Sequence, residues 1–298
     1  MEARREAEDI RREALNGRGM DLPPITSSQN RQLSQVRRLI ARPRECRKEG
    51  LLVADGIHLV QEALRARLQC RGLFALATDR NAEITAIVQE ATQRRLPVYR
   101  VLDHLFRTFS PLETPEGVLG IFERPSQPRA QIFQGTGEGS RHHLVVAHRL
   151  QDPSNIGALT RSAFAAGMQG LITTAGTVDP YHHRALRASQ GATFHLPVQV
   201  DQPLGPVFNS LRHFGYRSVA LSPQGTVDLL DLDLRPPTAV FLGAEGSGLD
   251  AAVEEAVDLR VRIPMQPGLE SLGVAAAGAV MFFWLRLAGR NGSGPQRA

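Results

Sequence analysis

The feature that most constrains this chain is a recurring pair, a short apolar run followed by a loop rich in glycine or proline. Within residues 240–287, the apolar run VFL leads into GAEGSG, and a later run leads through IPMQPG to a final apolar helix. Upstream, residues 152–167 (DPSNIGALTRSAFAAG) place a polar loop at the start of a helix. Because open α/β sheets bind ligands at the loops that follow their strands, this pattern predicts an α/β fold with a site at these loops.

The charge balance favours a polyanionic partner, and the cysteine content favours a reducing compartment. The 298 residues carry a formal net charge of +5, and Lys48 is the only lysine, so almost all of the cations are arginines. The planar arginine fork fits phosphate and so indicates nucleic acid, although genome composition also enriches arginine. Cys46 and Cys70 are the only cysteines, and neither a signal sequence nor an apolar run of the ~20 residues needed to span a membrane is visible. A cytoplasmic protein is therefore expected.

Changes in composition along the chain predict two α/β domains. A charged arm at residues 1–22, expected to be disordered, precedes a small domain at 23–124, in which alternating strands and helices predict a mostly parallel sheet. Residues 125–141, rich in Pro, Gly, Ser and Gln without periodicity, are expected to be a linker. The second domain, at 142–290, carries the loops described above and is followed by a polar tail at 291–298.

Basic residues cluster on and after the first predicted helix of the small domain, and two more arginines lie on a helix predicted at residues 181–189. A solvated helix face explains such a cluster without any function. The alternative is contact with phosphates, which positions a nucleic acid without reading its sequence. The residues proposed to contact RNA are Arg31, Arg37, Arg38, Arg44, Arg47, Lys48, Arg184 and Arg187.

Two common kinds of site are not indicated by the sequence. No glycine-rich phosphate loop of the dinucleotide or Walker type opens an early βα unit, which argues against a dinucleotide-dependent oxidoreductase. The adjacent pairs His142/His143 and His182/His183 lack metal-ligand spacing, because neighbouring residues point to different sides of a strand or a helix. We therefore expect no metal site, and we expect these four histidines to face solvent or RNA.

Four segments of the second domain resemble a known family. They are NIGALTRSAFAAG, RASQGATFHLPV, VFLGAEGSGL and IPMQPGLESLGVAAAG, and they resemble, in order and spacing, the motifs of the SpoU/TrmH family of RNA ribose 2′-O-methyltransferases, which is part of the SPOUT class. The resemblance covers residues 144–287. Taken alone, Asn155 would be only a helix cap and Arg161 only a solvated side chain, but both lie inside the first of these segments.

The resemblance has implications for the fold and the partners. ITSSQNRQLSQVRRLI and GLLVADGIHLVQEAL resemble a substrate-binding domain often fused ahead of the methyltransferase, with a small ribosomal-protein-like α/β fold. The second domain is expected to be a SPOUT α/β domain whose C-terminal part forms a deep trefoil knot. The enzyme is expected to work as a homodimer through the knot helices, and ribosomal RNA is favoured over transfer RNA as its substrate.

The resemblance also implies a cofactor and a set of site residues. The cofactor is S-adenosylmethionine, bound largely by backbone groups of the strand-end loops. The implied cofactor-binding residues are Thr173, Thr174, Ala175, Gly176, Leu242, Gly243, Ala244, Gly246, Ile263, Met265, Ser271 and Leu272. The implied catalytic residues are Asn155, Arg161, Glu245 and Ser271. Because arginine stays protonated, with a pKa above about 12, we expect Arg161 to bind phosphate and stabilise the forming alkoxide rather than act as a base.

The last motif departs from the family pattern at one position. The family usually has asparagine two residues after the serine, whereas this chain has Gly273 after Ser271 and Leu272. A non-catalytic RNA-binding homologue of the same fold therefore stays open as an alternative. The sequence also leaves open the target nucleotide, whether the methylation serves ribosome maturation or antibiotic resistance, and whether Met1 or Met20 is the true start.

Overall fold

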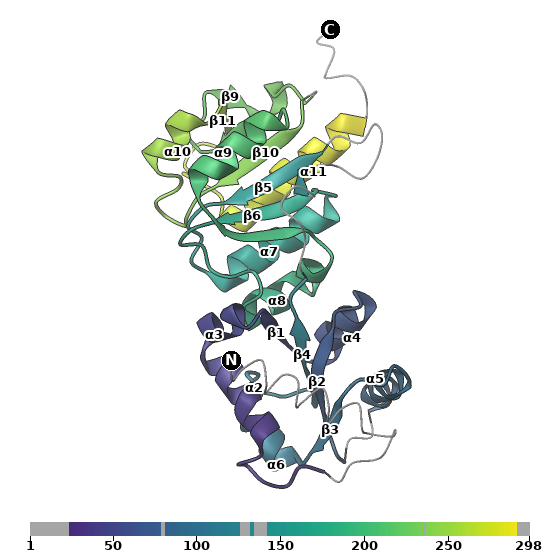
Figure 1. Cartoon of the computed structure of the whole chain (residues 1–298). Helices are drawn as coiled ribbons and strands as arrows, with labels where there is room; N and C mark the ends of the chain where they lie inside the picture. The colour runs from purple at the N-terminus through teal and green to yellow at the C-terminus, as the bar shows by residue number, and fades with distance from the viewer. Residues whose placement is uncertain (1–23, 79–80, 126–131, 134–141, 235, 291–298) are drawn as a thin grey trace. The chain divides into compact units, whose positions relative to one another are not determined.

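The structure, a computed structural model, describes residues 24–78, 81–125, 132–133, 142–234 and 236–290 (Figure 1). The chain divides into two compact units, Met1–Pro125 and Ser126–Ala298. The arm expected at 1–22, most of the linker expected at 125–141 and the tail expected at 291–298 lie outside the described residues.

Unit 1 is built on a four-stranded sheet in the order β1-β4-β2-β3. Its strands are β1 (Leu51–Asp55), β2 (Cys70–Leu76), β3 (Val98–Val101) and β4 (Val118–Glu123). Strands β2 and β3 are parallel, but β4 is antiparallel to both of its neighbours, so the mostly parallel sheet predicted for this domain is wrong. The reason is the connection after β3. It contains only the short helix α6 (Asp103–Phe106), and it leads into β4 at the edge of the sheet where β2 ends. A parallel β4 would need a crossover back to the opposite edge.

The helices of unit 1 pack by the apolar faces that the sequence gives them. They are α2 (Arg31–Ala41), α3 (Pro43–Lys48), α4 (Ile57–Arg65), α5 (Ala82–Gln93) and α6. Helix α2 starts at Asn30, whose side chain accepts a hydrogen bond from the backbone N–H of Gln32 at 2.9 Å. Its Leu33, Val36 and Leu39 are spaced by three and are buried in the core of the unit.

Unit 2 is built on a seven-stranded, fully parallel sheet in the order β7-β6-β5-β10-β8-β11-β9. Its strands are β5 (His143–Ala147), β6 (Gly170–Thr174), β7 (Val198–Gln202), β8 (Arg217–Leu221), β9 (Val227–Asp228), β10 (Thr238–Leu242) and β11 (Leu259–Arg262). Every residue of the paired central strands β5 and β10 is buried, as expected for a parallel sheet covered on both faces. The α/β fold predicted for this domain is confirmed.

Helices cover both faces of this sheet and make three layers (Figure 1). One face packs against α7 (Pro153–Ala165), α8 (His183–Ser189) and α11 (Val274–Arg290), and the other against α9 (Leu204–His213) and α10 (Ala251–Ala256). Helix α11, with 17 residues, is the longest described helix, and no helix in the described part of the chain qualifies as a membrane span.

Two glycines bring the helices of the first layer unusually close together. A Cβ added at Gly157 in α7 would lie 2.3 Å from the carbonyl oxygen of Ala185 in α8. A Cβ added at Gly278 in α11 would lie 2.3 Å from Cδ1 of Leu159 in α7. Helix α7 is therefore fixed between α8 and α11, and its first turn is fixed relative to the ends of the strands.

We predict that Gly157→Ala destabilises the protein by about 1–3 kcal/mol, because the new methyl group would force α7 away from a backbone oxygen that cannot move alone. The free energy of unfolding in urea measures this effect. Gly205→Ala is the matched control, because Gly205 lies in α9 with nothing within 4 Å of the added Cβ, and alanine favours a helix. Equal stability of the two variants would contradict the close contact of α7 and α8.

Candidate functional site

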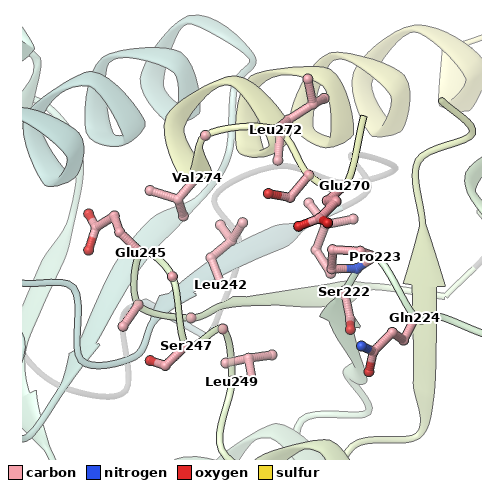
Figure 2. Close-up of a pocket in the computed structure, with 18 of the residues that line it drawn as sticks. Ser222, Pro223, Gln224, Leu242, Glu245, Ser247, Leu249, Glu270, Leu272 and Val274 are labelled. Atoms are coloured by element: carbon pink, nitrogen blue, oxygen red, sulfur yellow. The ribbon is translucent and has the colours of Figure 1, made fainter. Parts of the chain in front are cut away.

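A pocket of about 510 Å³ lies at the carboxyl ends of β8, β10 and β11. It is formed mainly by three segments, residues 221–224, residues 242–249 and a segment from Ile263 to Ala277, and Glu254 of α10 also lines it. Figure 2 shows side chains from all three segments around Leu242, the last residue of β10. The place and size of this pocket are those of a small-molecule site in an open α/β sheet.

The loop of residues 243–249 supplies one wall of the pocket, mainly through its backbone. A Cβ added at Gly243 would lie 2.2 Å from the backbone carbon of Gly248, so only glycine allows the two ends of this loop to approach. Ala244 and Gly248 exchange two backbone hydrogen bonds of 3.0 and 2.9 Å. The loop is therefore a tight turn, and Glu245 and Ser247 are among its residues that line the pocket (Figure 2).

The segment between β11 and α11 supplies the opposite wall. Ile263, Met265, Ser271 and Leu272, all predicted to contact the cofactor, line the pocket with residues 242–246. The structure thus brings together, at one place, residues of three of the four predicted cofactor segments. Gly273 also lines the pocket, and a Cβ added there would have nothing within 4 Å.

The third wall, residues 221–224, was not predicted from the sequence. Leu221 ends β8, and Ser222, Pro223 and Gln224 follow it into the pocket (Figure 2). The available signal was the sequence SPQG directly after a short apolar run, which is the same pattern that identified the other loops. This segment belongs to the site because β8 lies next to β10 in the sheet.

The predicted segment Thr173–Gly176 lies elsewhere. It comprises the last two residues of β6 and the two residues that follow. Strand β6 is separated from β10 by β5, and none of the four residues is among the described residues that line the pocket. The side chains of its two threonines are buried and used internally. Thr173 accepts a hydrogen bond from the backbone N–H of Asp201 at 3.1 Å, and Thr174 contacts His148 at 2.8 Å. Cofactor contact by this segment stays a prediction.

Asn155 reaches the pocket through Glu245. The Asn155 side-chain amide donates to Glu245 Oε1 at 2.7 Å, joining the first turn of α7 to the glycine-rich loop. Asn155 does not cap the helix, because Asp152 does so by accepting from the backbone N–H of Ser154 at 2.7 Å, with Pro153 in the first turn. The amide of Asn155 is therefore available for the site rather than for the helix terminus.

Arg161 lies six residues further along α7, on its exposed surface, and is not among the described residues that line the pocket. At 100° per residue, six residues place Arg161 about 120° around the helix from Asn155. Of the four predicted catalytic residues, Glu245 and Ser271 line the pocket, Asn155 bonds to Glu245, and Arg161 stands apart.

A buried histidine that the sequence analysis missed lies next to the glycine-rich loop at 243–249. His148 follows β5 and is only 2% exposed. Its Nδ1 lies 2.8 Å from Thr174 Oγ1, and its Nε2 lies 2.9 Å from Asp250 Oδ2. The hydrogen bond from His148 has the largest effect on Asp250 and holds the pKa of its carboxyl below the ordinary value. Burial opposes this effect, and a bond from the backbone of Val253 and the charge of Arg149 add to it. A single histidine after an apolar run has no spacing that would have marked it.

The four predicted surface histidines behave differently from one another. His143 is buried, and its Nδ1 accepts a hydrogen bond from the backbone N–H of Thr238 at 3.2 Å, so its assignment to the surface is wrong. Its side chain points inward because both faces of β5 are covered. The rings of His182 and His183 are half-buried with centroids 4.3 Å apart, and burial lowers the pKa of His183 to about 4. No group of residues suited to hold a metal ion occurs among the described residues.

The predicted RNA-contacting residues fall into two groups. Arg31, Arg44, Lys48, Arg184 and Arg187 are exposed. Arg37, Arg38 and Arg47 are half-buried. Arg38 forms ion pairs with Glu45 and Glu49, which raise its pKa, so this side chain contributes to the packing of α2 on α3. The side chains of the exposed group are accessible to solvent, as a phosphate contact requires.

Comparison with known proteins agrees with this geometry. Residues 142–283 match the SpoU rRNA Methylase family, and residues 30–120 match the MRM3-like substrate binding domain. A protein of Synechocystis sp. described as an uncharacterized tRNA/rRNA methyltransferase is 32% identical over 273 residues, covering 89% of this chain and 94% of its own.

Two further relatives carry more specific descriptions. The 23S rRNA (guanosine(2553)-2′-O)-methyltransferase RlmP of Bacillus subtilis is 26% identical over 262 residues, covering 88% of this chain and 98% of its own. The crystal structure of an AdoMet-bound rRNA methyltransferase from Sinorhizobium meliloti matches with a TM-score of 0.77 at 26% identity, covering 88% of this chain and 97% of its own. The chain therefore belongs to the SpoU family of S-adenosylmethionine-dependent RNA methyltransferases, with a substrate-binding domain ahead of the methyltransferase domain.

Proposed function

We propose that this protein transfers a methyl group from S-adenosylmethionine to a ribose 2′-hydroxyl of ribosomal RNA. The observation that carries the proposal is the pocket at the ends of β8, β10 and β11, with Glu245 in its wall and Asn155 bonded to Glu245. The pocket supplies a place for a small donor molecule, and the polar pair next to it supplies groups that can orient a hydroxyl.

The chemistry of the pocket suits S-adenosylmethionine. Carboxylates of Glu245, Glu254 and Glu270 line it, as do the apolar side chains of Leu242 and Val274, and this combination fits a ligand with positive charges and a flat base. When bound, S-adenosylmethionine supplies a methyl group on a sulfonium, which is already a good electrophile. The residues proposed to hold it are Leu221, Ser222, Leu242, Gly243, Ala244, Gly246, Ile263, Met265, Ser271 and Leu272.

The remaining task of the protein is to hold the ribose hydroxyl in line with the methyl group and to stabilise it as it loses its proton. We propose that the pair of Asn155 and Glu245 orients the nucleotide at the pocket and that Ser271 holds it from the opposite wall. Arg161 is exposed, and its guanidinium group suits a phosphate, so its proposed role is to bind a phosphate of the RNA and stabilise the forming alkoxide.

The test of the proposal is a map of ribose methylation in RNA from cells with and without this gene. We expect one methylated ribose of ribosomal RNA to disappear with the gene and to return with the wild-type protein. Arg161→Ala is expected to reduce methylation at that position about 100-fold, because a charge that stabilises the alkoxide is lost.

The control is Arg212→Ala, which removes an exposed arginine from α9, on the other face of the sheet. It should methylate as the wild type does. Normal methylation by Arg161→Ala would remove that residue from the mechanism, and loss of a transfer RNA methylation instead would move the substrate to that class. A complete map without any difference would contradict the proposed function.

The preference for ribosomal RNA has two supports. Residues 142–283 match a family described as SpoU rRNA Methylase, and the relative from Bacillus subtilis is described as a 23S rRNA methyltransferase. The exposed basic residues Arg31, Arg44 and Lys48 of unit 1 are proposed to contact its phosphates. A cytoplasmic location, expected from the sequence, is part of the proposal and can be tested by cell fractionation.

Gly273 supports the alternative, a non-catalytic RNA-binding homologue. Where the family usually has an asparagine amide, this position leaves open space at the pocket wall. We favour the enzyme because Glu245, Ser271 and the pair with Asn155 are all in place. Calorimetry with S-adenosylmethionine separates the two functions, because a non-catalytic module would not bind the cofactor.

We predict that Gly273→Asn folds normally and binds S-adenosylmethionine more tightly, by about three- to tenfold, because one added hydrogen bond contributes about 0.5–1.5 kcal/mol. The backbone of Gly273 is outside the left-handed region, and nothing lies within 4 Å of an added Cβ, so a side chain fits. Titration calorimetry measures the gain. Gly205→Asn, away from the pocket, should leave the affinity unchanged, and an unchanged affinity in Gly273→Asn would rule out cofactor contact at this position.

We further propose that the protein is a homodimer through α11. Val280, Phe283 and Leu287 are 43%, 40% and 56% exposed, and their spacing of three and four places them on one face of this helix. An exposed apolar face of this kind indicates an interaction surface.

We predict that Phe283→Arg converts the dimer to a monomer, because a charge would have to be buried at the interface. Sedimentation measures the change. Leu230→Arg, at a side chain 53% exposed outside α11, should leave the dimer intact. A Phe283→Arg variant that remains a dimer would place the interface elsewhere.

We also propose the two finer features of the fold, the deep trefoil knot of unit 2 and the ribosomal-protein-like fold of unit 1. The support for the knot is the path of the chain, which leaves β11 on one side of β10 and returns to pack α11 on α7. The returning segment passes the loops at 221–224 and 243–249 in the pocket. An experimental structure in which that segment passes outside both loops would disprove the knot.

A further inference from the structure

A residue outside the glycine-rich loop at 243–249 holds this loop in place. The two residues that flank it are Leu242, at the end of β10, and Asp250, the N-cap of α10. Both bond to His148. The His148 backbone N–H donates to the carbonyl oxygen of Leu242 at 2.8 Å, and the His148 ring contacts the Asp250 carboxylate at 2.9 Å. One buried residue therefore holds both ends of the loop.

The hydrogen bonds around the ring fix its orientation and its tautomer. Asp250 Oδ1 accepts from the backbone N–H of Val253 at 3.1 Å, and Asp250 Oδ2 faces His148 Nε2 and, at 3.3 Å, Arg149. An ionised carboxylate only accepts, so Nε2 carries the proton, and Nδ1 accepts from the hydroxyl of Thr174. Both ring nitrogens are then hydrogen-bonded, as a buried polar group requires.

The glycine content of the loop explains why it needs support from His148. The loop contains three glycines, Gly243, Gly246 and Gly248, whose backbone is the least restrained of any residue. Its contacts include the paired bonds of Ala244 with Gly248 and the bond from Asn155 to Glu245. Because a misplaced contact of about 1 Å can cost about 100-fold in rate, the loop needs support from a rigid element.

We infer that His148 is a positioning residue, which clamps both ends of loop 243–249 to the end of β5 and thereby sets Glu245 against Asn155. It does not touch the pocket and acts only through Asp250 and Leu242. Its effect on methyl transfer rests on the proposed function. Its effect on the loop does not, and the two are measured separately.

Two substitutions of similar size separate the two sides of the ring. The amide nitrogen of His148→Gln is placed near the position of Nε2 and keeps the bond to Asp250. The amide of His148→Asn is placed near Nδ1, keeps the contact with Thr174 and loses Asp250. We expect His148→Asn to weaken S-adenosylmethionine binding and lower kcat/KM by about tenfold to a hundredfold, and His148→Gln to stay within about threefold of the wild type.

The loop itself is followed by hydrogen exchange of amides 243–250 in the protein alone, without RNA or cofactor. Exchange should accelerate about tenfold or more in His148→Asn but not in His148→Gln. Since a general loss of stability would affect both variants and all regions, amides of α9 serve as the internal control. If neither His148 variant folds, Asp250→Ser keeps a helix cap for α10 but no longer reaches His148, and it should reproduce the loss.

The outcomes separate the two proposals. Equal behaviour of His148→Asn and His148→Gln, or unchanged exchange in Asp250→Ser, would overturn the clamp. The expected exchange pattern together with an absence of methyl transfer in the wild type would support the clamp and overturn the proposed function. Arg149→Ala is the control for the second contact of Asp250 and should leave loop exchange within about threefold of the wild type.

Discussion

The structure of the site depends on one constraint, the parallel arrangement of β5, β10 and β8. Parallel strands bring all of their carboxyl ends to the same edge of a sheet. Since β10 pairs with β5 on one side and β8 on the other, the loops that follow these strands, at 148–152, 221–224 and 243–249, begin at the same edge. The helix that follows the first of these loops is joined to the last loop by the bond between Asn155 and Glu245, which are 90 residues apart in sequence. The pocket would not exist if β10 had added to an edge of the sheet.

Close helix packing completes what the sheet begins. Asn155 can bond to Glu245 only if the first turn of α7 lies next to the carboxyl ends of the strands. Gly157, one turn from the cap at Asp152, lets α8 approach α7, and Gly278 lets α11 approach from the other side. The helix that supplies Asn155 and the helix that follows the last pocket loop are therefore packed together, and both pack on the same face of the sheet.

Features of the fold that follow from local sequence patterns were predicted correctly, whereas features that depend on which strands pair with one another were not. Apolar runs and caps were enough for the α/β domains and for the loops at 243–246 and 263–272, which do share the pocket. The parallel sheet of unit 1 was wrong, because nothing local reveals that β4 returns between β1 and β2. Segments 221–224 and Thr173–Gly176 carry the same turn signals, and only the strand order places the first at the pocket and the second two strands away. His148 has no local signal, since its role comes from partners 26 and 102 residues away.

The same physical property explains why such partners are needed. Glycine allows the backbone of residues 243–249 to approach itself and a ligand, but it also removes the side chains that would hold a loop by its own packing. Order must then come from residues outside the loop. Here it comes from the ring of His148 at the base and from the amide of Asn155 at the tip. Gly273 lies on the opposite wall, where a Cβ would meet nothing within 4 Å, so that wall offers backbone alone at this position. A site built this way gains close backbone contact with its ligand and depends, for its shape, on a few buried hydrogen bonds.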